Sequence, residues 1–299
     1  MGAHCVQIFF VISGYLGCSY FFRCSDSTVI EYYKKRSLRI LPIYYAAILA
    51  AMIYVELFTQ GFNKDVFYLG WARYYLGLNT LLPSADFWHW NNAFGFWTMT
   101  NFIVFYALIP FVIKIITTYK RSVILFIICY IIHCAVRLIL KHSVTEAPFP
   151  DLNYMIWYSP LVQMQYFALG VLTFFAVKEN KKSIAAILLI AIAMLPERFC
   201  SISLLYAVLT CLFIISVNDK DINITGIPKK SLQFISKYSF HIYLSHLLAL
   251  SIAQRIAASF YFPPSLPYHL TTIIAWIIFT IIICYILELF QKLSNKIFT

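Results

Sequence analysis

A basic stretch between two long apolar runs carries the residue types best suited to chemistry. It reads Lys34, Lys35, Arg36, Ser37, Leu38, Arg39, Ile40, Leu41 and Pro42. A guanidinium offers a planar fork that matches phosphate oxygens and stays charged at any working pH. Arg36 and Arg39 are three residues apart, so on a helix they share one face and can converge on one anion. The pattern therefore predicts a phosphate site, and an anchor for anionic lipids is the alternative.

Two histidines, His241 and His246, lie in one apolar segment and are offset around a helix rather than stacked. Ionisable groups inside a membrane are costly and tend to line cavities. His246 is a candidate for the substrate path and for catalysis, and a core histidine bonded to a neighbouring helix is the alternative. The eight cysteines show no C-x-x-C spacing. We interpret them as small core residues and expect neither a metal site nor a disulfide framework.

The composition of the chain is that of a membrane protein. Of the 299 residues, 62% are hydrophobic and only 12% are charged. The mean hydropathy is +0.78. A helix needs about 20 apolar residues to cross about 30 Å of hydrocarbon. We therefore predict an all-α, polytopic membrane helix bundle with about nine spanning helices, at residues 5–22, 38–58, 96–116, 122–140, 154–177, 183–196, 201–217, 239–258 and 269–290. The second of these spans would hold Pro42 in its first turn, where the missing N–H costs little.

Charge bias orients this bundle, because Lys and Arg are enriched in cytoplasmic loops. If residues 59–95 stay on one side, most of the 23 Lys and Arg residues, including the basic stretch, fall on one face, which we predict to be cytoplasmic. Met1 is then expected outside and Thr299 inside. A tenth span at residues 66–82 would separate the basic stretch from Lys120 and Arg121, so we interpret this segment as interfacial or re-entrant. The formal net charge of +11 is spread over short loops, which argues against a nucleic-acid partner.

No internal repeat or hydrophilic block interrupts the chain, so residues 1–299 are predicted to form a single membrane domain. The longest loops, about residues 59–95 and 141–153, are predicted to lie outside. They carry aromatic rings beside amides and carboxylates: Asp86, Trp88, His89, Trp90, Asn91, Asn92, Glu146 and Asp151. Such groups suit sugar rings, and an aromatic belt at the membrane interface is the alternative.

Four blocks of the sequence carry a resemblance to a known family. The first is the run from Val6 to Leu16, VQIFFVISGYL, followed by Tyr32, Arg36, Arg39 and Pro42. The others are Trp97-Thr98 with Phe105, Tyr106 and Pro110, then Phe167, Leu169 and Gly170, then Ser236, Ser239, Ile242, Tyr243, Leu244 and His246. In order and spacing these blocks resemble the acyltransferase 3 family of integral membrane proteins. The resemblance covers nearly the whole chain.

The resemblance implies transfer of an acyl group, usually acetyl, from cytoplasmic acyl-CoA to a hydroxyl of a cell-envelope carbohydrate. Acyl-CoA (acetyl-CoA), the carbohydrate acceptor and the lipid bilayer of the cell (inner or plasma) membrane are then the expected partners. Arg36 and Arg39 match the family's Arg-x-x-Arg motif and would hold the donor phosphates together with Lys35. Ser13 and Gly14 suggest close helix packing, with room for the donor's pantetheine arm as the alternative.

The sequence also departs from the family's pattern. The family's catalytic histidine belongs to a helix before the Phe-Phe-Val-Ile-Ser-Gly segment, and His4 lies too close to that segment to match. Phe102 stands where the family carries a glutamate, five residues after Trp97. We expect that the start is internal to a longer reading frame or that the chain is a degenerate copy. Two alternatives to an enzyme are an exporter of a glycan or lipid-linked sugar and a structural partner in envelope assembly.

Overall fold

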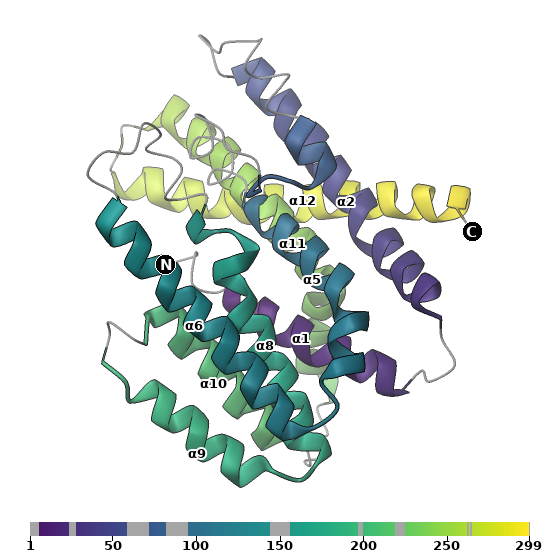
Figure 1. The fold of residues 1–299 in the computed structure, drawn as a ribbon. Coiled ribbons are helices and arrows are strands. Elements are labelled where there is room, and N and C mark those ends of the chain that lie inside the picture. Colours follow the sequence, from purple (N-terminus) through teal and green to yellow (C-terminus); the bar gives the residue numbers. More distant parts are fainter. Residues whose placement is uncertain are drawn as a thin grey trace. The chain divides into compact units, whose positions relative to one another are not determined.

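The chain is helical throughout the part that the computed structural model describes, which is residues 6–23, 28–58, 72–81, 95–143, 156–196, 200–218, 225–261, 263 and 265–298. These ranges contain no strand (Figure 1). The labelled helices are α1 (Val6–Arg23), α2 (Val29–Phe58), α5 (Trp97–Ile115), α6 (Tyr119–Ser143), α8 (Pro160–Lys178), α9 (Lys182–Ala193), α10 (Ile202–Val217), α11 (Gly226–Phe260) and α12 (Leu266–Phe298). The predicted all-α helix bundle is confirmed, and a labelled helix occupies each predicted span.

Six helices in the described part are long and apolar enough to cross a membrane: α1, α2, α5, α6, α8 and α12. With 12 residues, α9 reaches only about 18 Å at 1.5 Å per residue, and α10 has 16 residues. The 35 residues of α11 are long enough, but its first part carries Lys229, Lys230 and Lys237. The chain is therefore a multi-pass membrane protein in which length and apolarity together support six of the predicted spans.

The second helix begins earlier than its apolar run predicts. It starts at Val29 rather than near residue 38, because Thr28 and Glu31 cap it reciprocally. The Glu31 N–H donates to the Thr28 hydroxyl (3.2 Å), and the Thr28 N–H donates to the Glu31 carboxylate (3.3 Å). This capping box satisfies two N–H groups that the first turn would leave unpaired. The expectation that Pro42 lies in the first turn is wrong, since Pro42 is inside the helix.

One of two compact units in the chain comprises Met1–Tyr32, Thr80–Ala85 and Trp97–Ile222. Its centre is α8, in which 83% of the residues of the candidate membrane span are buried. Gly14 of α1 and Gly170 of α8 bring these helices into backbone contact. A Cβ added at Gly14 would lie 2.2 Å from the Phe167 carbonyl oxygen, and one added at Gly170 would lie 2.1 Å from the Val11 carbonyl oxygen. The prediction of close helix packing at Gly14 is confirmed.

The other unit comprises Tyr33–Asn79, Asp86–Phe96 and Asn223–Thr299, and its principal helix pair is α11 with α12. The end of α2 is tied to α11 by Arg255. Its Nε donates to the Tyr54 hydroxyl (2.9 Å), and its Nη2 donates to the Phe58 carbonyl oxygen (2.6 Å). An arginine near a helix end can simply extend its charged group toward the membrane interface. Arg255 instead holds two helices together.

A short piece of the predicted re-entrant segment is described in this second unit. Residues 72–76 form a single short helix, too short to cross the hydrocarbon core. The Tyr44 hydroxyl of α2 donates to the Tyr74 carbonyl oxygen (2.7 Å), and the Asn79 amide donates to the Phe96 carbonyl oxygen (2.7 Å). The predicted outer-loop residues Asp86 to Asn92, Glu146 and Asp151 lie outside the described part.

Candidate active site

The basic stretch forms part of the early turns of α2. Lys34, Lys35 and Arg39 are exposed and Arg36 is half-buried. Because the helix begins at Val29, Arg36 and Arg39 stand on formed turns, and their three-residue spacing places them on one face. The sequence predicts the motif and its place on a helix. The structure adds that both arginines lie on a regular helix with a capped N-terminus.

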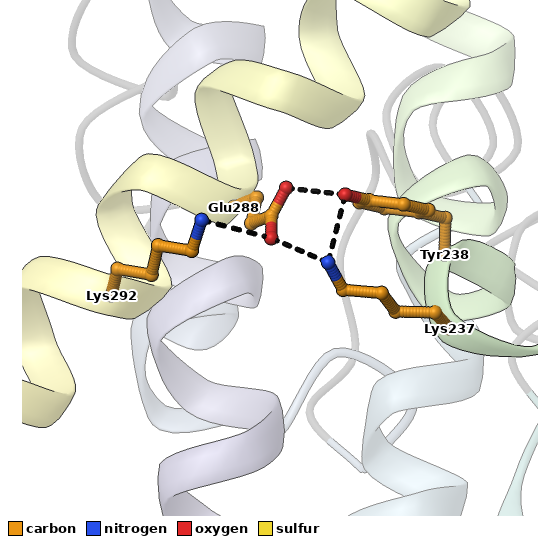
Figure 2. A network of polar contacts seen from close by, with 4 residues as sticks. All are labelled: Lys237, Tyr238, Glu288 and Lys292. Carbon is orange, nitrogen blue, oxygen red and sulfur yellow. Dashed lines mark hydrogen bonds and ion pairs between the residues drawn. The ribbon is translucent and has the colours of Figure 1, made fainter. Parts of the chain in front are cut away.

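A charged network joins α11 to α12 in the same unit, and Figure 2 shows its four side chains. The carboxylate of Glu288 accepts hydrogen bonds from the Tyr238 hydroxyl (2.5 Å) and from the Lys237 ammonium (2.8 Å). Lys292, one helical turn after Glu288, forms an ion pair with the same carboxylate (3.2 Å). One acidic group therefore holds two ammonium groups and a phenol.

Exposure differs sharply within this network. The Glu288 side chain is 9% exposed, whereas the Lys237 and Lys292 side chains are 61% and 65% exposed. Hydrogen bonds to the Glu288 carboxylate and to the Tyr238 hydroxyl raise the pKa of Lys237, which lies just before the predicted span, above its usual range. The Lys237 ammonium therefore stays charged, and both lysine side chains are exposed while the carboxylate that holds them is covered.

The charged network adjoins the start of α2 through two residues. The Gln291 amide of α12 donates to the backbone carbonyl oxygen of Arg39 (3.2 Å). His241 of α11 lies within electrostatic reach of Arg39, Lys237 and Glu288, and the Gln291 side chain is close to its ring. Arg39 of the Arg-x-x-Arg motif, the lysine pair and His241 thus lie near one another in this unit. The sequence did not indicate this assembly.

His246 lies about one and a half turns beyond His241 on α11 and is half-buried. Its Nδ1 is 2.6 Å from the Tyr243 carbonyl oxygen. A carbonyl can only accept, so this contact assigns the proton to Nδ1 and leaves Nε2 as an acceptor. The His246 carbonyl oxygen in turn accepts from the Trp276 indole N–H (2.8 Å). A histidine oriented in this way can take a proton through Nε2.

The first unit contains a second polar region, an amide cluster made of Gln7, Asn101, His133, Gln163 and Gln165. The Asn101 amide donates to the carbonyl oxygens of Tyr158 (2.8 Å) and Trp97 (3.2 Å). Gln165 Nε2 lies 2.8 Å from His133 Nδ1, and the Gln7 amide donates to Gln163 (3.5 Å). All five residues are buried and neutral amides dominate, so the cluster joins helices and brings no net charge of its own.

Phe102, which stands in place of a family glutamate, belongs to the apolar core of the first unit. It is buried, with its ring 5.1 Å from that of Phe10 and 5.9 Å from that of Phe167. A carboxylate there would be surrounded by aromatic rings and would have to pay a desolvation cost. The site's acid–base chemistry must therefore come from other residues.

Metal ligation finds no support in the described part of the chain. No three His, Cys, Asp or Glu side chains come together there in a way that could hold a metal ion. The described cysteines Cys18, Cys129, Cys134, Cys200, Cys211 and Cys284 carry free thiols.

A multi-pass helical bundle with exposed cations on α2, α11 and α12 defines an integral membrane protein equipped to bind an anion. Residues 1–289 match the family model described as an acyltransferase domain, so the chain belongs to the acyltransferase 3 family. It is accordingly an acyltransferase that transfers groups other than aminoacyl groups. No curated protein and no solved structure matches the chain.

Proposed function

We propose that this protein is a membrane O-acyltransferase that moves an acetyl group from cytoplasmic acyl-CoA to a hydroxyl of a cell-envelope carbohydrate. We further propose that residues 1–299 act as one membrane domain in the cell (inner or plasma) membrane. The family match runs through both compact units, which supports a single functional domain. The charge bias of the loops supports a cytoplasmic position for the donor site.

The observation that carries this proposal is the gathering of cations around Arg36 and Arg39. The donor's phosphates need charge-assisted contacts, and guanidinium groups supply them bidentately. Lys35 is exposed next to Arg36, and the Gln291 amide binds the Arg39 backbone. This arrangement suits a phosphorylated donor better than it suits a neutral one.

The reaction needs a base that takes the proton of the acceptor hydroxyl as its oxygen attacks the thioester carbonyl. The carbon–sulfur bond then breaks, the acetyl group stays on the acceptor oxygen as an ester, and the thiol of coenzyme A leaves with a proton. We propose His246 as the candidate base, because its Nδ1 contact with the Tyr243 carbonyl oxygen leaves Nε2 free to accept.

Replacing both arginines tests the donor site. We expect Arg36→Ala with Arg39→Ala to abolish acetylation of surface glycan while the protein remains in the membrane, because the donor phosphates lose charge-assisted contacts. Lys114→Ala with Lys120→Ala is the matched control, since both lysines are exposed and the charge lost is the same. Acetyl content is measured by mass spectrometry of the glycan, and membrane content by immunoblot. Acetylation that survives the arginine changes would overturn the assignment.

The same variants distinguish the exporter predicted as an alternative from the sequence. An exporter that binds a neutral glycan would lose surface glycan when inactivated, whereas a transferase would leave the glycan in place without its acetyl groups. A structural partner in envelope assembly would need neither arginine for acetylation. The ratio of acetyl groups to glycan therefore separates the three functions.

A further inference from the structure

The two lysines around Glu288 are arranged to bind something besides Glu288. A single carboxylate is shared by two ammonium groups and the Tyr238 hydroxyl, so its charge balances only one of the two cations (Figure 2). Both lysine side chains are more than 60% exposed, at 61% and 65%. The network therefore presents a net positive charge at the protein surface, held in place by a covered acid.

A buried histidine next to this pair lacks a hydrogen-bond partner. His241 is only 5% exposed, and neither of its ring nitrogens makes a hydrogen bond of acceptable geometry. Its ring packs edge-on against Tyr238 at 5.5 Å between centroids. An unpaired buried polar group is costly, and a bound ligand that supplies a partner would relieve that cost. His241 thus marks a place where a bound ligand could supply a hydrogen-bond partner.

This place lies beside the Arg-x-x-Arg motif. His241 is within electrostatic reach of both Arg39 and Lys237, and Gln291, the neighbour of Lys292, donates to the Arg39 carbonyl oxygen at 3.2 Å. All these residues belong to the same compact unit. A ligand held by the arginines could therefore extend to the lysine pair.

The chemistry of the donor supplies a ligand with two separate anionic parts. Coenzyme A carries a diphosphate, which links the nucleoside to the pantetheine arm, and a phosphate monoester on the ribose 3′ position. A phosphate monoester has about −1.5 to −2 charge at pH 7 and three acceptor oxygens. Two arginines suit one of the anionic parts, and the other needs further cations.

We propose that Lys237 and Lys292 form a subsite for the 3′-phosphate of the coenzyme A donor. Glu288 is the positioning residue that holds the two ammonium groups, and His241 donates a ring N–H to the bound phosphate. This inference rests on the proposed function and adds to it the part of the donor that the enzyme recognises. The shared chemistry is a phosphate monoester, which a lipid headgroup can also present.

Equilibrium binding tests the subsite without requiring turnover. The full-length protein in phosphatidylcholine nanodiscs is titrated with coenzyme A and with 3′-dephospho-coenzyme A. We expect the wild type to bind coenzyme A about tenfold more tightly, because charge-assisted hydrogen bonds to one phosphate are lost in the dephospho compound. Lys237→Gln with Lys292→Gln should bind both compounds equally, with an affinity near that of the wild type for the dephospho compound.

Control variants separate a specific subsite from general attraction. Lys229→Gln with Lys230→Gln removes two exposed lysines of the same helix, and should keep the tenfold preference. Arg36→Gln with Arg39→Gln should weaken the binding of both compounds by the same factor. Circular dichroism in the same nanodiscs confirms that each variant remains folded.

Each failure has a different meaning. If the wild type binds neither compound, the proposed function fails and the subsite with it. If it binds both compounds equally, the subsite is overturned while the donor site stands. A last experiment measures binding to phosphatidic acid, a lipid phosphate monoester, added to the nanodiscs. If the lysine variants lose affinity for that lipid but keep the preference for coenzyme A over its dephospho form, the pair binds lipid and the inference is wrong.

Discussion

The two compact units solve the problem of buried polarity in opposite ways. The first places neutral amides, Asn101, Gln163 and Gln165, inside its helices and pairs them with carbonyl oxygens or with His133. The second gathers full charges around Glu288, between α11 and α12, and leaves the two lysine side chains exposed. Neutral hydrogen bonds can stay buried at little cost, whereas charges must remain hydrated or bind a counterion.

This difference indicates which unit carries which task. A region of neutral polar groups that bond across helices serves to fix those helices, as the donors of Asn101, Gln163 and Gln165 do, although Asn101 Oδ1 and Gln165 Oε1 make no hydrogen bond. A region with accessible, same-sign charge keeps electrostatic capacity for a ligand. The comparison therefore supports a structural role for the polar groups of the first unit and anion binding by those of the second. Each of the following changes tests one of these two roles.

The largest effect is expected from closing the contact between α1 and α8. Gly14→Ala would place a Cβ 2.2 Å from the Phe167 backbone oxygen, so the two helices must separate. Overpacking of this kind costs about 3 kcal/mol or more when a backbone atom is the obstacle. We expect a large drop in the thermal unfolding temperature of the purified protein in detergent.

Gly17→Ala on the same helix is the matched control for this change. Its added Cβ would lie 3.2 Å from Ile109 Cγ1, a side-chain atom that can rotate away. We expect this variant to stay within about 1 kcal/mol of the wild type. Equal destabilisation by the two substitutions would show that backbone contact is not what holds the first unit together.

The helices themselves could be predicted from the sequence, because a run of about 20 apolar residues is a strong signal of a membrane helix. The start of α2 was missed although a local signal was present, the Thr28-x-x-Glu31 capping box. The apolar run begins only near residue 38, so hydrophobicity alone predicts a helix that starts there rather than at Val29. Polar residues can extend a capped helix well beyond its apolar part.

The candidate site could be predicted only in part. Arg36 and Arg39 are recognisable because the two lie within one turn of each other. Glu288 could not be recognised as part of the site from the sequence, since its partner Lys237 is 51 residues away and no spacing rule links the two. Side-chain networks between distant helices depend on how the helices pack, and a single sequence does not specify that packing.

A smaller effect is expected from removing the charge of Glu288. Glu288→Gln keeps the shape of the side chain but leaves two ammonium groups without a counterion. We expect a loss of about 1–2 kcal/mol, toward the low end because the lysines are exposed and solvent screens them. The measurement is thermal unfolding at low and at high salt. The destabilisation should shrink as salt rises, and a loss that ignores salt would contradict a charge-based role.

The smallest effect concerns the contact between His133 and Gln165 in the first unit, and it tests whether that unit relies on neutral hydrogen bonds. A double-mutant cycle with His133→Leu and Gln165→Leu should give a coupling of about 0.6 kcal/mol, the average for interhelical hydrogen bonds in membrane proteins. Each single change leaves a buried partner unpaired, and the double change removes both groups. Because the pair lies 2.8 Å apart and is buried on both sides, its coupling should be the same at low and high salt. A salt-dependent coupling would mean that the first unit also relies on charge, and the division of roles between the two units would be lost.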